Sequence, residues 1–449
     1  MKTKFQPQNA RELALVALEG VVENGAYSNL QVDQLLKKYP LADKDRRLAT
    51  NIIYGVLQHK LTLEYWLNGF VQGKRLDPWV KTLLLSALYQ YHYLQRVPDW
   101  AVTDESIEIA KRRGNPGIRK FVTGVLHAIL RKGLPDLRQI NERDLRLSIE
   151  NSVPRWLVNE LTREYGEEDT EKILQSINEP AHQVIRVNTA KIDLPTVKQA
   201  LDAAGIEYQE SQVAQNALVI TKGEIISSDL FKNGEITIQD ESAMLAVESM
   251  HIEPGDKVLD ACAAPGGKTV QIAEALTNED GHVDALDIHQ HKVKLIEKNA
   301  RRLGVEKRVT AHALDAREVD QLFDDESFDK ILVDAPCSGI GLLRRKPEIR
   351  YTKTLNDSKQ LHEIQLAILN AVAAKVKKGG IITYSTCTIL QQENDDTVQA
   401  FLAEHPEFEL VKTTTARKVK DSRHSPTLTI LPSDFDSDGF FISSLKKGI

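Results

Sequence analysis

The chain has 449 residues, of which 41% are hydrophobic and 27% are charged, and its formal net charge is −6. This composition is that of an ordinary globular protein with room for about two to four domains. No apolar run approaches ~20 residues, which excludes a transmembrane helix, and the first apolar stretch has no small-residue cleavage site of a signal peptide. We therefore expect a cytoplasmic protein without membrane contact.

The cysteines are few and odd in number: Cys262, Cys337 and Cys387. Sparse cysteines without metal spacing exclude a disulfide framework and a zinc site, so we predict no metal. For one cysteine taken alone, a small buried hydrophobic side chain is the commoner role.

Positive charge is concentrated in the first third of the chain. Residues 1–150 hold 23 Lys/Arg against 16 Asp/Glu, and residues 111–132 contain seven basic residues and no acid. That stretch is either a solvated helical face or a surface that contacts phosphates, and both interpretations stay open.

Residues 1–142 are predicted to form a helical domain. Several stretches in it carry apolar residues at helical spacing, namely 11–22, 46–71, 77–94 and 119–132. Asp104 and the pair Asn115-Pro116 have the character of helix starts.

Two further domains are predicted after the helical one. Residues 143–235 alternate between strands and a helix and suggest a small α+β module that resembles RNA-recognition folds. Residues 236–449 then alternate regularly between strands and helices, which indicates an α/β, Rossmann-like, doubly wound parallel sheet.

Five consecutive predicted strands of the last domain end in a polar or reactive side chain. Carboxyl ends of parallel strands meet at one edge of a sheet, where ligands bind. A single aspartate there is usually a turn former, but five in register favour a functional crevice. The five residues are Asp260, Asp287, Asp315, Asp334 and Cys387.

The loop "ACAAPGGKT" at 261–269 is small and glycine-rich, which lets a ligand approach the backbone. It is neither a phosphate-binding P-loop, which needs glycine where Cys262 stands, nor a GxGxxG dinucleotide loop. Asp287 follows Gly267 by 20 residues, the place of a carboxylate that binds a ribose diol. A ribose without a pyrophosphate loop suggests S-adenosylmethionine, with Asp315 near the adenine.

Cys337 and Cys387 follow neighbouring predicted strands, which invites covalent chemistry on cytosine. A thiolate that adds to C6 makes C5 nucleophilic enough to take a methyl group. The thiol needs a lowered pKa, which Lys268 and a helix start could provide. Asp334 could contact the polar edge of the base.

The motifs "DACAAPGGKT", "DAPCSG" and "STC" occur here in that order at 260–269, 334–339 and 385–387. Together they closely resemble RNA 5-methylcytosine methyltransferases of the NOL1/NOP2/Sun type. The resemblance implies Cys387 as nucleophile and Cys337 as an aid to product release. DNA cytosine methyltransferases use the Pro-Cys cysteine instead, so the reverse assignment stays open.

The resemblance also implies a set of cofactor-binding residues. They are Cys262, Ala263, Ala264, Pro265, Gly266, Gly267, Lys268, Asp287, Asp315 and Asp334. Two positions depart mildly from the family pattern: Glu348, where Asp is more usual, and Thr388, where Ser is frequent.

The N-terminal domain resembles NusB, an RNA-binding helical fold, through residues 45–57 and 120–132. A NusB-like domain, a small module and a methyltransferase domain in this order resemble bacterial enzymes that methylate one cytosine of 16S ribosomal RNA. The resemblance implies that 16S ribosomal RNA is the partner of this chain, and we expect the chain to be a monomer.

Three other functions were weighed. A non-catalytic RNA-binding factor is disfavoured because both cysteines and all strand-end aspartates are present. Methylation of an exocyclic amine is disfavoured because "DAPCSG" lacks the second proline and the aromatic residue of that motif. An NAD-dependent dehydrogenase is disfavoured by the glycine loop.

Overall fold

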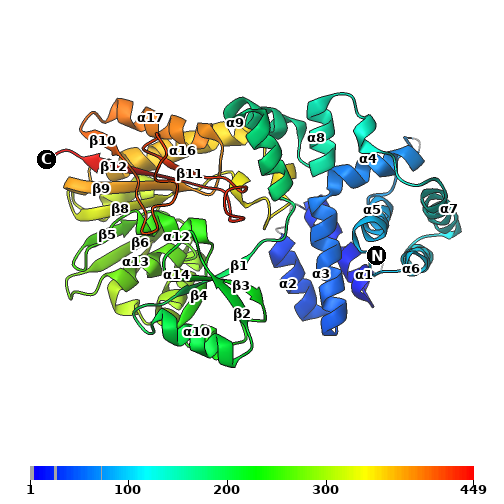
Figure 1. Cartoon of the computed structure of the whole chain (residues 1–449), viewed down its shortest axis with the longest axis horizontal. Helices are drawn as coiled ribbons and strands as arrows, with labels where there is room; N and C mark the ends of the chain where they lie inside the picture. Colours follow the sequence, from blue (N-terminus) through cyan, green and yellow to red (C-terminus); the bar gives the residue numbers. More distant parts are fainter. Residues whose placement is uncertain (1–4, 25–27, 72) are drawn as a thin grey trace. The chain divides into compact units, whose positions relative to one another are not determined.

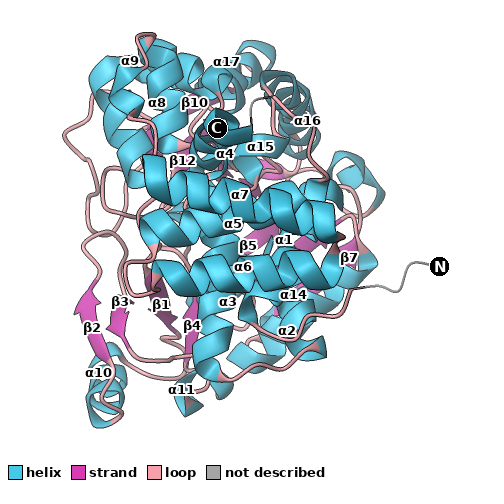
Figure 2. Ribbon diagram, turned by 90° about the vertical axis from the view of Figure 1, so that its right-hand side faces the viewer, coloured by secondary structure: helices cyan, strands magenta, loops and turns pink. Residues whose placement is uncertain are grey.

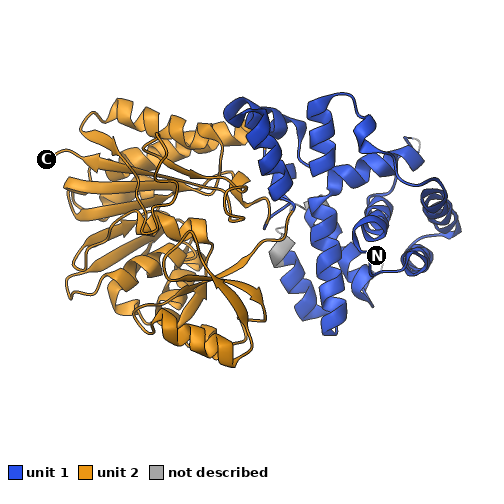
Figure 3. Ribbon diagram, viewed as in Figure 1, with its two compact units in different colours: residues 1–178, 345–353 blue, residues 179–344, 354–449 orange. Residues whose placement is uncertain are grey.

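A computed structural model describes residues 5–24, 28–71 and 73–449 of the chain. The chain forms two compact units (Figure 3): unit 1 comprises residues 1–178 and 345–353, and unit 2 comprises residues 179–344 and 354–449. Across the described ranges, no helix combines the length and apolarity needed to cross a membrane.

Unit 1 is helical, as predicted (Figure 1). Helix α5 is buried along almost its whole length, because apolar residues fill successive positions between Val80 and Tyr89. Helices α1 to α4, α6 and α7 share one hydrophobic core with α5. The helices are α1 (Ala10–Asn24), α2 (Ser28–Lys38), α3 (Asp43–Gln58), α4 (Lys60–Val71), α5 (Pro78–Tyr93), α6 (Asp99–Arg113), α7 (Pro116–Lys132), α8 (Arg143–Asn151), α9 (Arg155–Ser176) and α15 (Ile349–Thr352).

Two details of the helix prediction needed correction and one was confirmed. The stretch 46–71 is two helices, because the backbone of His59 leaves helical geometry. Asp104 lies inside α6, which begins at Asp99 after Pro98. Asn115 caps α7 as predicted: its side chain accepts a hydrogen bond from the Ile118 N–H at 3.0 Å, and Pro116 occupies the first helical position.

The predicted three-part division and the two units do not coincide. Helices α8 and α9 lie within the predicted module 143–235 but belong to unit 1. The rest of that module forms the first part of unit 2. The boundaries after residues 142 and 235 therefore stay predictions.

Unit 2 begins with a four-stranded antiparallel sheet in the order β2-β3-β1-β4, drawn side by side in Figure 2. Apolar residues of β1 and β3 pack with the buried face of α10. The elements are β1 (Gln183–Val187), α10 (Leu194–Ala203), β2 (Glu207–Glu210), β3 (Ala217–Lys222), α11 (Asp229–Lys232) and β4 (Ile236–Ile238).

The second sheet of unit 2 contains the strands predicted to end at the crevice. Its order is β10-β12-β9-β8-β5-β6-β7, with β11 paired to β12. The pairs among β5 to β9 are parallel, as predicted, whereas β12 joins β9 in antiparallel register. The strands are β5 (Lys257–Asp260), β6 (His282–Asp287), β7 (Val309–Ala313), β8 (Phe328–Asp334), β9 (Val376–Thr386), β10 (Phe408–Val411), β11 (Leu428–Ile430) and β12 (Phe440–Lys447).

Helices cover both faces of this sheet (Figure 1). One hydrophobic core joins the sheet to α12, α13 and α14, and another joins its opposite face to α16 and α17. This is the doubly wound arrangement that the alternating pattern predicts. The helices are α12 (Glu241–Glu248), α13 (Gly267–Ala275), α14 (Gln290–Leu303), α16 (Leu355–Ala373) and α17 (Asp395–Glu404).

Candidate active site

A cavity of about 430 Å³ opens at the carboxyl ends of β5, β6, β8 and β9. Most of the residues predicted for the site line it. They are Cys262, Ala264, Asp287, Asp315, Asp334, Cys337 and Cys387. Ala263, Pro265, Gly266, Gly267 and Lys268 belong to the same loop and helix start but are outside this lining set.

The two glycines of the loop differ in their surroundings. Gly266 adopts φ +100°, a conformation that favours glycine, and a Cβ there would lie 3.0 Å from the Ile296 Cα of α14. Gly267 begins α13, and a Cβ built on it would meet nothing within 4 Å. The turn therefore requires glycine at position 266, whereas the surroundings of Gly267 have room for a side chain.

Asp334, at the end of β8, is held by two neighbours. Its Oδ2 accepts a hydrogen bond from Lys268 Nζ at 2.8 Å, and its Oδ1 accepts one from the Ser385 hydroxyl at 2.9 Å. The ammonium of Lys268 also lies 5.1 Å from the centre of the Phe440 ring. Asp334 raises the pKa of Lys268 against the opposing effect of burial, so Lys268 remains a cation beside the cavity.

Asp260, at the end of β5, is only 1% exposed. Its Oδ2 accepts a hydrogen bond from the Thr269 hydroxyl at 2.7 Å. Burial raises the pKa of Asp260 to about 7. It lies behind the loop 261–266 and does not line the cavity, so its position supports the loop rather than a ligand.

Asp287 and Asp315 line the outer part of the cavity. Asp287 Oδ1 accepts a hydrogen bond from the His289 N–H at 2.9 Å. Asp315 forms a 2.6 Å ion pair with Arg317, whose hydrogen bond lowers the pKa of that carboxyl. Both groups are thus held as oriented carboxylates, which suits recognition of hydroxyl or amino groups.

The two thiols predicted to meet do so. The Sγ atoms of Cys337 and Cys387 lie 2.7 Å apart, and the backbone N–H of Cys387 donates to Cys337 Sγ at 3.3 Å. All three cysteines are free thiols. The contact arises because β8 and β9 are neighbouring parallel strands, so the turns that follow them share one edge of the sheet.

Cys337 does not have the lowered pKa that covalent attack requires of a nucleophile. The hydrogen bond between Cys337 and Cys387 and the burial of Cys337 both raise the pKa of Cys337. Burial also raises the pKa of Cys262. Lys268 interacts electrostatically with Cys387. The two thiols therefore differ in their electrostatic surroundings.

A buried network behind the thiols was missed by the sequence analysis. Glu393 is 0% exposed. Its carboxylate accepts hydrogen bonds from the Ser338 N–H at 2.8 Å, from Ser358 Oγ at 2.9 Å and from Gln365 Nε2 at 3.1 Å. Because Ser338 follows Cys337 directly, Glu393 fixes the turn that carries that thiol.

The same network reaches the other thiol. The Ser338 hydroxyl donates to Thr388 Oγ1 at 2.9 Å, and Asn394 Nδ2 donates to the Thr388 carbonyl at 3.1 Å. Thr388 follows Cys387, so Glu393 and Asn394 tie both cysteine turns together. In the sequence, the adjacent residues Glu393 and Asn394 are a weak signal of this network, because an acidic residue just before a helix usually faces solvent.

The basic stretch 111–132 is partly neutralised within unit 1. Arg112 forms an ion pair with the buried Glu12, and Arg113 forms one with Glu19 at 2.7 Å. Lys111, which is ion-paired with Glu108 at 3.2 Å, lines a cavity of about 610 Å³ at the α6–α7 turn together with Arg119 and Lys120. The surface available to phosphates is therefore narrower than the sequence suggests.

Comparison with known proteins finds three matching families along the chain. Residues 247–446 match the family described as 16S rRNA methyltransferase RsmB/F, residues 8–131 match the NusB family, and residues 153–226 match the RsmF/B-like ferredoxin-like domain. A probable ribosomal RNA small subunit methyltransferase B of Bacillus subtilis is 45% identical, over 98% of this chain and 99% of that protein.

This chain belongs to the RsmB family of 16S rRNA methyltransferases. The ribosomal RNA small subunit methyltransferase B of Klebsiella pneumoniae is 32% identical, over 98% of each chain. The crystal structure of PH0851 has a TM-score of 0.83 at 26% identity and covers 99% of this chain and 100% of its own. The likeness to these proteins spans all the predicted domains.

Membership in the RsmB family confirms the predicted activity and cofactor. The chain is an S-adenosylmethionine-dependent 16S rRNA cytosine-5 methyltransferase and acts on 16S rRNA. The helical NusB domain, the ferredoxin-like module and the α/β catalytic domain are confirmed as fold classes. The comparisons assign no residue roles.

The cavity fits S-adenosylmethionine by its chemistry. Oriented carboxylates at Asp287 and Asp315 suit hydroxyl and amino groups, and the carboxylate of Asp334 suits a positively charged sulfonium. Ile288, which is 60% exposed, and Ile364 contribute apolar surface to the lining, and a flat purine ring buries such surface favourably.

Proposed function

We propose that this chain methylates its cytosine through a covalent bond between Cys387 and C6 of the base. The observation that carries the proposal is the pair of thiols 2.7 Å apart at a cavity suited to the methyl donor. Because C5 and C6 are shielded by stacking in a helix, the target must be single-stranded or flipped out of its stack.

The proposed cofactor site divides among three groups of residues. Asp287 would bind the ribose diol, and Asp315 would contact the adenine. The segment from Cys262 to Lys268 would border the methionine part, with Asp334 near the sulfonium. When bound, S-adenosylmethionine supplies an electrophilic methyl group.

The proposed chemistry uses the two thiols differently. The Cys387 thiolate forms the S–C6 bond, which gives C5 the electron density it needs to accept the methyl group. The C5 proton then passes to solvent, and its electron pair restores the ring double bond as the S–C6 bond breaks and Cys387 departs. Lys268 supports this role because it interacts electrostatically with Cys387 and so places a cation near the proposed nucleophile.

Cys337 is proposed to assist release of the methylated RNA. Its raised pKa keeps it a protonated thiol next to the adduct sulfur. A neutral proton donor at that position favours departure of Cys387 from the base. Asp334 is proposed to contact the polar edge of the cytosine.

An adduct assay tests both assignments. Wild type, Cys387→Ala and Cys337→Ala are each incubated with S-adenosylmethionine and protein-free 16S rRNA and then separated on a denaturing gel. We expect Cys387→Ala to be inactive and to form no adduct, and Cys337→Ala to accumulate a protein–RNA adduct. Exchanged results would give the nucleophile role to Cys337, and two active variants would contradict covalent catalysis.

We propose that Arg119 and Lys120 contact RNA phosphates, because ion pairs already occupy Lys111, Arg112 and Arg113. We further propose a cytoplasmic monomer with domains at 1–142, 143–235 and 236–449. Light scattering of the purified chain tests the oligomeric state.

A further inference from the structure

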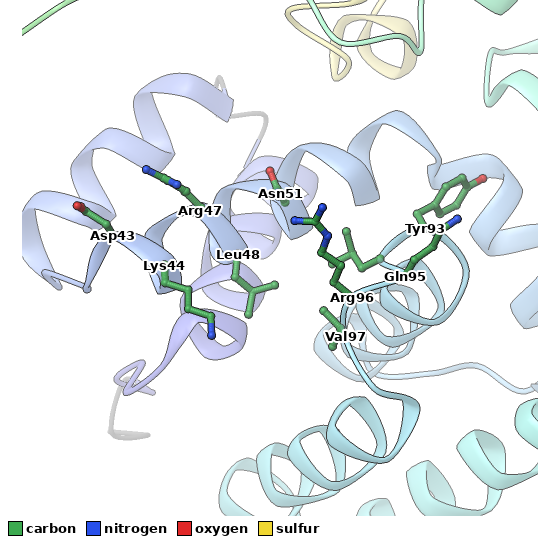
Figure 4. A pocket seen from close by; sticks show the side chains of 10 residues that line it. Asp43, Lys44, Arg47, Leu48, Asn51, Tyr93, Gln95, Arg96 and Val97 are labelled. Carbon is green, nitrogen blue, oxygen red and sulfur yellow. The ribbon is translucent and has the colours of Figure 1, made fainter. Parts of the chain in front are cut away.

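A second site candidate lies in unit 1, on a face formed by α3 and the loop between α5 and α6. A cavity of about 660 Å³ opens there (Figure 4). Its lining comes from two segments that are separated in sequence but meet in the fold. The lining residues are Asp43, Lys44, Arg47, Leu48, Asn51, Tyr93, Leu94, Gln95, Arg96 and Val97.

The cavity carries uncompensated positive charge. Lys44, Arg47 and Arg96 are exposed, and none of them forms an ion pair with a residue that the structure describes. The one acidic residue of the lining, Asp43, is 3.0 Å from Arg46 and so is already balanced. Arg112 and Arg113, by contrast, are paired with acids of α1. Cations left unpaired around one cavity attract an anionic partner.

The rest of the lining suits nucleotides better than a simple anion. Asn51 and Gln95 offer carboxamide groups that can both donate and accept hydrogen bonds, as base edges require. Leu48, Leu94 and Val97 add apolar surface against which a base or a sugar can pack.

The charged face continues along α3. A second cavity of about 370 Å³ shares Arg47 and Asn51 with the first. Its other lining residues are Val32, Asp33 and Leu36 of α2 and Arg46, Thr50 and Tyr54 of α3, and Arg46 is the partner of Asp43. Two adjoining hollows with a shared arginine and amide provide a track longer than one nucleotide.

We propose that this face of α3 binds a single-stranded segment of the RNA substrate. Lys44, Arg47 and Arg96 contact phosphates, and Asn51 and Gln95 contact base edges. The inference rests on the proposed function for the identity of the RNA, and it adds a contact site that is separate from the α6–α7 turn. The face would hold the RNA strand outside the catalytic cavity and so contribute affinity rather than chemistry.

Matched triple variants test the proposal. K44A/R47A/R96A removes the three cations of the cavity, and R138A/R163A/K172A removes three exposed cations elsewhere in unit 1, each of which has an acidic partner. Binding of full-length protein to protein-free 16S rRNA is measured at several salt concentrations. We expect the first variant to lose affinity about tenfold or more and its salt slope to fall by about 2, since each phosphate contact contributes about 0.7. The second should change affinity less than about twofold.

The amide pair gives an independent readout. We expect N51A/Q95A to weaken RNA binding while leaving the salt slope unchanged, because uncharged contacts release no counterions.

Photocrosslinking of 4-thiouridine-substituted 16S rRNA should label peptides that contain residues 43–51 or 93–97. Poly-glutamate that displaces the RNA at equal charge concentration would indicate an acidic peptide site instead and would overturn the proposal.

The outcomes separate this inference from the proposed function. If K44A/R47A/R96A keeps its native melting curve and binds RNA as wild type does, the α3 site is wrong while adduct formation by wild type still supports the chemistry. If wild type forms no methylated product or adduct with 16S rRNA, the proposed function fails whatever the α3 variants show.

Discussion

At the scale of single residues, Glu393 shows how a buried charge can position two reactive groups. Its carboxylate accepts from Ser338, Ser358 and Gln365, and Ser338 in turn contacts Thr388. Every contact to Glu393 comes from a donor, so a carboxylate fits and a carboxamide does not. A buried carboxylate in such a network is costly to disturb.

We expect Glu393→Gln to reduce methylation by about a hundredfold, because its amide group would face donors and shift both cysteine turns. Adduct yield on denaturing gels, measured in the Cys337→Ala background, reports whether Cys387 still reaches the base. Glu404→Gln, at an exposed carboxylate of α17, is the matched control and should retain wild-type yield. A normal adduct yield in Glu393→Gln would show that the network has no positioning role.

Asp260 makes stability depend on pH with a defined sign. Its pKa is near 7 in the folded chain and 3.8 ordinarily, so between these values the folded state holds a proton that the unfolded state has lost. Rising pH therefore destabilises the fold, by at most ~4 kcal/mol for a shift of about three units. We expect Asp260→Asn to raise the thermal unfolding midpoint over wild type more at pH 8 than at pH 4.5. If the variant and wild type differed in unfolding midpoint by the same amount at both pH values, the raised pKa of Asp260 would be contradicted.

At the scale of elements, the turn between β5 and α13 depends on one glycine. Gly266 has φ +100° and sits against the backbone of Ile296, whereas Gly267 has open space. We expect Gly266→Ala to cost about 1–3 kcal/mol of stability through backbone strain, and Gly267→Ala to cost less than about 1 kcal/mol. Denaturant midpoints of the two variants provide the comparison. A similar loss in both would mean that the strain does not come from positive φ.

At the scale of the whole molecule, residues 345–353 return the chain to unit 1 between β8 and α16. Arg350 is 0% exposed, and its Nη1 donates to the carbonyls of Gln58, Asn151 and Ser152 and to the side chain of Asn178. The Tyr351 hydroxyl donates to the Leu57 carbonyl at 2.8 Å. A segment of the methyltransferase sequence thus belongs to the helical unit.

We expect Arg350→Ala to lower stability by several kcal/mol, because it leaves buried carbonyls without their donor. The released segment should become a site of cleavage by a protease, visible as two fragments that meet near residue 350. Lys353→Ala, at a half-buried position of the same segment, should remain resistant. Equal resistance of the Arg350 variant would show that other contacts hold the segment.

Much of the fold and part of the site could be predicted because their signals are local. Apolar periodicity marks the helices and strands, and Asp287, Asp334 and Cys387 stand at the ends of predicted strands. The meeting of Cys337 with Cys387 followed from strand order alone. Pairing of Arg112 with Glu12 could not be predicted, because the partner lies 100 positions away and charge patterns do not specify distant partners.

By itself, then, the sequence determined the domain classes, the doubly wound parallel sheet, the chemistry available at the ends of its strands and the family. Patterning and turn residues fix these features within a few neighbouring positions. The tertiary structure alone decided that Glu393 lies buried behind both thiols, that residues 345–353 pack into the helical unit, and that Lys44, Arg47 and Arg96 share a cavity. These depend on contacts between distant segments, which form only when the chain excludes water from a common core.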